Sequence, residues 1–60
     1  MAIYDNVKHF AETRGMSIRQ IELQAGLSNG SIRKWNNSKP DVFKVRSVAK
    51  ILNVTIDDLL

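Results

Sequence analysis

The segment from Asn29 to Asn37 carries hydrogen-bond donors at a spacing that suits the edges of DNA bases. Asparagine can bond bidentately to adenine, and arginine or lysine can bond to the acceptors of guanine. At 100° per residue from Asn29, the polar residues fall between about 0° and 140°: Asn29, Gly30, Arg33, Lys34 and Asn37. Between about 200° and 300° lie Ser31, Ile32 and Trp35. The pattern predicts a helix with one buried face and one row of donors, which a major groove admits.

A tight turn precedes this segment. Ser17 can accept from the free N–H groups that begin a helix near Ile18, and Gly26 can take the left-handed conformation that ends it. Ser28 is a second candidate N-cap only two residues after the glycine. So short a turn makes the two helices cross steeply, as in a helix-turn-helix.

Apolar residues recur through this motif and beyond it. Within the motif they are Ile21, Ala25, Leu27, Ile32 and Trp35, with glycine at Gly26. A later run comprises Lys39-Pro40, Val45, Val48-Ala49, Leu52 to Thr55 and Asp57 to Leu60. In these residues, Met16 to Leu60 resembles the lambda-repressor-like (Cro-type, XRE family) helix-turn-helix domain of phage and bacterial transcription regulators.

The resemblance implies a repressor of phage or prokaryotic type, acting in the bacterial cytoplasm. Its third helix would enter the major groove of double-stranded DNA, and a homodimer would bind a palindromic operator. The expected base contacts are Ser28, Asn29, Gly30, Arg33 and Lys34. The expected phosphate contacts are Arg19, Gln20, Asn37, Ser38, Lys39 and Lys44.

Arg19 and Gln20 also have a simpler interpretation. They lie in the first turn of their helix, where the helix N-terminus favours a phosphate, but they could equally be solvated side chains. Lys39 has the same alternative, although it follows the expected recognition helix.

Glu22 and Ile18 depart from the family pattern. The family usually has a small residue where this chain has Glu22. At the start of the first motif helix, where this chain has Ile18, the family often has a polar residue, commonly glutamine. A carboxylate between two motif helices should be ion-paired, because a buried bare charge is costly. The candidate partners of Glu22 are Arg14, Arg19 and Arg33.

The size and composition limit the function. Sixty residues form one domain with a small core and little room for a cleft. There is no cysteine and only one histidine, so neither a disulfide, a metal site nor a cofactor is expected. No carboxylate pair, nucleophile with a base, or glycine-rich phosphate loop indicates an enzyme.

The charge is concentrated in the middle of the chain. The net charge is +3, but the segment from Arg14 to Lys50 holds eight cations and two anions, a local charge of +6. Such a surface favours a polyanionic partner, of which DNA is the commonest.

Hydrophobic spacing and caps predict an all-α domain of five helices, over about 3–14, 18–25, 29–36, 42–52 and 56–60. Gly15 should end the first helix, and Pro40 should separate the third from the fourth. Asp41 is placed to cap the fourth helix and Asn53 to end it. Thr55 with Asp58 forms a capping box for the last helix.

The aromatic residues and the histidine receive no role in chemistry. Trp35 could stack on a nucleotide, but its angle beside Ile32 favours the core. Tyr4 is expected to be partly buried, and His9 to lie on the surface.

No apolar run approaches the length of a signal or membrane segment, and no small-molecule ligand is indicated. The chain stops in an apolar stretch, so Leu59 and Leu60 either close the core or join a dimer interface, or a longer regulator continues beyond them.

A second function stays open. Helix-turn-helix domains also serve as antitoxins or anti-repressors, whose main partner is a protein and whose DNA affinity is weak. The salt dependence of binding to plasmid DNA distinguishes the two functions.

Overall fold

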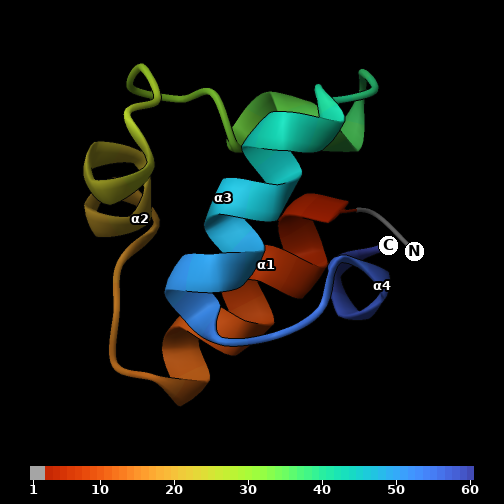
Figure 1. The fold of residues 1–60 in the computed structure, drawn as a ribbon. Helices are drawn as coiled ribbons and strands as arrows, with labels where there is room; N and C mark the ends of the chain where they lie inside the picture. The colour runs from red at the N-terminus through yellow and green to blue at the C-terminus, as the bar shows by residue number, and fades with distance from the viewer. Residues whose placement is uncertain (1–2) are drawn as a thin grey trace.

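Four α-helices and one short 3-10 helix form the regular structure of residues 3–60, the part of the chain that the computed structural model describes. They are α1 (Ile3–Thr13), α2 (Ile18–Ala25), the 3-10 helix η1 (Arg33–Asn36), α3 (Val42–Leu52) and α4 (Ile56–Leu59). No strand occurs among these residues, which confirms the all-α prediction. Helix α3 passes through the middle and contacts α1, α2 and α4 (Figure 1).

Helix α2 has the predicted caps at both ends. The Ser17 hydroxyl accepts from the Gln20 backbone nitrogen at 3.1 Å, and the Ser17 nitrogen donates to Gln20 Oε1 at 2.8 Å. Gly26 has φ +72°, and the Leu27 nitrogen donates to the Glu22 carbonyl oxygen at 2.8 Å. These are the bonds that satisfy free backbone groups at helix ends, so the helix begins and ends where the sequence predicts.

The predicted caps of α3 and α4 are also present. Asp41 Oδ1 accepts from the Phe43 nitrogen at 2.8 Å, and Asn53 ends α3 at φ +58°. Thr55 and Asp58 exchange two bonds of 3.1 Å in a capping box. Among the four α-helices, two predicted boundaries differ: α1 ends at Thr13 and α4 ends at Leu59.

One core joins the helices. Its buried hydrophobic residues are Val7, Ala11, Ile21, Ile32, Trp35, Val45, Val48, Ala49, Leu52 and Leu59. Trp35 is 7% exposed, which confirms its predicted place in the core. Tyr4 is partly buried and His9 is exposed, as predicted.

The two leucines in the last turn of the chain differ in their exposure to solvent. Leu59 is fully buried, whereas Leu60 is 61% exposed. The buried Asn6 side chain donates its Nδ2 to the Leu59 carbonyl oxygen at 2.8 Å and so joins α1 to α4. Leu59 therefore closes the core, and Leu60 does not.

The predicted third helix over 29–36 is wrong as an α-helix. Residues 29–32 form a turn, and Gly30 has φ +85°, which a right-handed helix does not contain. The bonds from Ser31 N to the Ser28 carbonyl and from Trp35 N to the Ile32 carbonyl span three residues. Because Ile32 and Trp35 are three apart, their spacing fits a 3-10 helix as well as an α-helix. The prediction of five α-helices is therefore not confirmed.

Candidate nucleic-acid interface

A buried carboxylate connects α2 to the turn at 29–32. Glu22 is 2% exposed, and its Oε2 accepts from the backbone nitrogens of Gly30 at 3.0 Å and Ile32 at 3.3 Å. Two backbone donors that an incipient helix would leave free are thereby satisfied. Glu22 therefore has a structural role: it holds the turn that carries two of the expected base contacts, Asn29 and Gly30.

Arg19 is the charged partner of this carboxylate. Its Nη1 lies 3.7 Å from Glu22 Oε1, so one of the three predicted pairings is confirmed. The other two are not formed. Arg14 lies instead over the Phe10 ring, with its guanidinium carbon 5.6 Å from the ring centre, and Arg33 has no carboxylate within 4.0 Å among residues 3–60.

A hollow of about 420 Å³ lies beside this contact. Its lining consists of Tyr4, Ile18, Arg19, Glu22, Asn29, Gly30 and Arg33. The fold therefore brings three expected base contacts, Asn29, Gly30 and Arg33, to the same place as one expected phosphate contact, Arg19.

Lys34 lies at a different hollow, of about 220 Å³. The residues around it are Ser31, Lys34, Trp35, Ser38, Lys39, Pro40, Asp41 and Lys44. Here one expected base contact, Lys34, joins the expected phosphate contacts Ser38, Lys39 and Lys44. The expected row of donors is thus divided between Arg33 and Lys34, which line different hollows.

Several predicted polar contacts are engaged within the protein. The Ser28 hydroxyl lies 2.6 Å from the Ser31 hydroxyl and caps no helix, so its predicted N-cap role is wrong. The Ser38 hydroxyl donates to the Lys34 carbonyl oxygen at 3.1 Å. Gln20 Oε1 is used in the capping box of α2.

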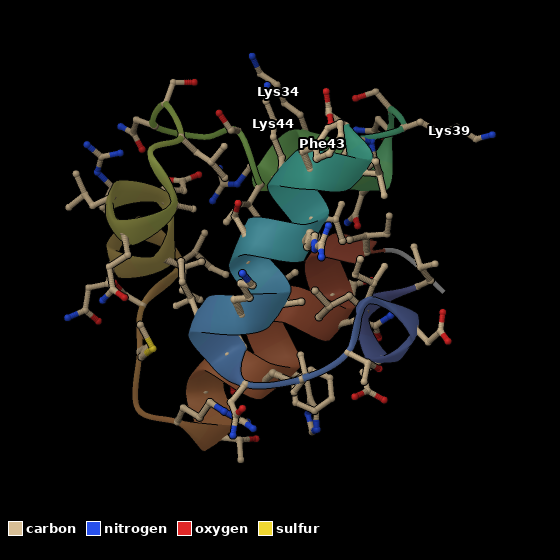
Figure 2. The ribbon with its side chains drawn as sticks, viewed as in Figure 1. Lys34, Lys39, Phe43 and Lys44 are labelled. Carbon is tan, nitrogen blue, oxygen red and sulfur yellow. The ribbon has the colours of Figure 1, made fainter. Side chains whose placement is uncertain are left out.

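The cations of the two hollows are all exposed, and they are Arg19, Arg33, Lys34, Lys39 and Lys44. Of the two carboxylates beside them, Glu22 is buried and Asp41 caps α3. The exposed charge on this part of the molecule is therefore predominantly positive. Figure 2 shows Lys34 and Lys44 extending from the end of the molecule where α3 begins, and Lys39 extending from the loop before it.

Phe43 is a surface feature that the sequence analysis missed. It is 70% exposed in the first turn of α3, at the same end of the molecule as Lys34 and Lys44 (Figure 2). Its position could have been found from the register of the helix, because the buried residues Val45, Val48, Ala49 and Leu52 define a stripe that excludes it. A large exposed aromatic side chain that precedes Lys44 in the chain, at the same end of the molecule as Lys34, is a candidate contact for a ligand.

Among residues 3–60, no three histidine, aspartate or glutamate side chains come together in a way that could hold a metal ion. None of the helices in this range has the length and apolar character needed to cross a membrane. The chain matches no protein-family model and no curated protein sequence.

Proposed function

We propose that this protein binds double-stranded DNA and regulates transcription as a repressor of the lambda-repressor-like type. The observation that supports the proposal is the gathering of five exposed cations around two neighbouring hollows, with the nearby Glu22 carboxylate buried. Cations in this arrangement suit a row of phosphates. The donors at Asn29 and Arg33 suit the base edges between them.

In the proposed complex, α2 and the segment 29–36 correspond to the two arms of a helix-turn-helix. The turn and η1 take the place of the recognition helix, with Asn29 and Arg33 directed to the major groove and Gly30 allowing close approach. Glu22 stabilises this segment by accepting hydrogen bonds from the backbone nitrogens of Gly30 and Ile32.

The remaining cations hold the DNA backbone on either side. Arg19 contacts one phosphate, and Lys39 and Lys44 contact others. Lys34, expected at a base, shares a hollow with these two lysines, so we assign it to a phosphate instead. Four or five such contacts predict a slope of log K against log salt of about −4. One module of this size buries a modest interface, so tight binding requires two copies on a palindromic operator with half-sites about 34 Å apart.

The test is selection of bound sequences from a randomised duplex pool at about 0.15 M salt, with the mass of the complex measured. The expected result is an inverted repeat bound by two copies of the chain. Binding without sequence enrichment would contradict a repressor and leave only non-specific DNA binding. Absence of salt-dependent binding to any duplex would contradict the DNA partner itself.

A protein-interaction module, such as an antitoxin or anti-repressor, is the second candidate function. It is favoured by an apolar hollow of about 230 Å³, which shares Lys39 and Pro40 with the hollow around Lys34. The apolar residues lining it include Ile3, Pro40, Val42, Ile56 and Leu60. Under this alternative, binding to plasmid DNA is weak, and a protein partner covers the apolar hollow.

A further inference from the structure

The exposed ring of Phe43 is not explained by the packing of residues 3–60. It is 70% exposed and lies outside the set of hydrophobic residues that pack against the core. Its backbone nitrogen caps α3 through Asp41, and that bond needs no aromatic side chain. The ring therefore contributes little to folding, and a leucine in its place should fold equally well.

The charges near Phe43 favour one kind of partner. Lys44 follows it in the chain and lines the same hollow as Lys34 and Lys39, against a single carboxylate, Asp41. An apolar protein surface covering the ring would have to desolvate neighbouring ammonium groups, which is costly. A nucleic-acid strand instead offers phosphates to the lysines and a flat base to the ring.

We propose that Phe43 stacks on an unpaired base, while Lys34, Lys39 and Lys44 bind the phosphates beside it. This inference rests on the proposed function, because it takes the lysines to face nucleic acid. It adds a preference for unpaired bases over an intact duplex. In an intact duplex both faces of each base are covered by its neighbours, so the ring has no face to stack on. A single strand, or a duplex with one bulged base, supplies an uncovered face.

The experiment compares three fluorescently labelled DNA ligands: a single strand of about 16 nucleotides, its intact duplex, and the duplex with one bulged base. Each is titrated with the wild-type chain and with Phe43→Leu, Phe43→Trp and Lys44→Gln. Leu23→Ala is the matched control, because Leu23 is 62% exposed and lines none of the hollows described above. Circular dichroism confirms that each variant is folded.

Phe43→Leu is expected to weaken binding of the single strand and the bulged duplex about tenfold, and to leave the intact duplex within about twofold. Phe43→Trp should retain the affinity, and the new indole should be quenched when the single strand binds. Lys44→Gln should weaken all three ligands alike, and Leu23→Ala none.

An equal loss on all three ligands from Phe43→Leu, or no loss on any, would overturn the stacking inference. If wild-type protein binds the duplex but Phe43→Leu changes nothing, the inference fails and the proposed function is retained. If the chain binds single strands in a Phe43-dependent way but selects no duplex sequence, the proposed function fails and the inference is retained. If no ligand binds, both fail.

Discussion

Glu22 Oε2 lies 3.0 Å from the backbone nitrogen of Gly30 and accepts its hydrogen bond, although eight residues separate the two. The same oxygen accepts from Ile32 N at 3.3 Å. A carboxylate on one helix thus supplies the acceptor for a turn that has left-handed geometry at Gly30. The shape of the expected base-contact segment depends on this contact as well as on its own residues.

Replacing Glu22 tests how much this contact stabilises the domain. Glu22→Ala leaves the Ile32 N–H buried without a partner and should lower the free energy of unfolding by about 2–3 kcal/mol. Glu22→Gln keeps one acceptor oxygen and should cost about 1 kcal/mol, or a fall in Tm of about 5 °C. Urea unfolding followed by circular dichroism measures both. Equal stability of the alanine variant and wild type would exclude a stabilising role for the carboxylate.

Gly30→Ala tests the turn directly. A Cβ at this position meets open space, so the expected loss of about 1–2 kcal/mol comes from the left-handed backbone alone. Gly15→Ala is the matched control, since Gly15 has φ +66° and equally open space but lies outside the two cationic hollows. Both variants should lose similar stability, whereas only Gly30→Ala should weaken DNA binding. A stabilised Gly30→Ala would indicate that segment 29–36 is an α-helix after all, because alanine favours a helix over glycine.

Arg33 and Lys39 should differ in what they contribute to DNA binding. Arg33→Ala is expected to lose about 1–3 kcal/mol on the selected sequence and to relax the preference at one base position. Lys39→Ala should weaken all sequences alike and reduce the salt slope by about one unit. Titration of the selected duplex and a scrambled duplex at several salt concentrations measures both effects. The base-contact assignment of Arg33 is wrong if the two variants behave in the same way.

Arg19→Gln should separate stability from binding. The Arg19 side chain is 49% exposed and its ion pair with Glu22 spans 3.7 Å, so solvent screening limits its contribution to less than about 1 kcal/mol. Folding should therefore be nearly unchanged, while the salt slope of DNA binding falls by about one unit. A large loss of stability with an unchanged slope would mean that Arg19 acts on Glu22 and not on a phosphate.

The ends of the helices could be predicted from the sequence because they are decided locally. Ser17 with Gln20 and Thr55 with Asp58 exchange bonds across three residues, and Gly26 needs only its own positive φ. Each of these interactions lies within a few neighbouring residues, so residue type and spacing suffice to predict it.

The segment 29–36 could not be predicted in the same way. The apolar spacing of Ile32 and Trp35 fits two kinds of helix, and the acceptor that favours the turn is Glu22, on another helix. The cationic residues of the site were predicted by type, but their division between two hollows depends on this geometry. The exposure of Phe43 could have been predicted, because its position in the helix lies outside the stripe of buried residues.

The bond from Asn6 Nδ2 to the Leu59 carbonyl spans 53 residues, so it can form only when most of the chain is closed into a single loop. Closure of so long a loop is entropically unfavourable until the intervening contacts have formed. Helix α4 has only four residues and cannot be stable alone, so its docking should accompany completion of the core. The bond between Asn6 and Leu59 should therefore form together with the last contacts of the core and not before them.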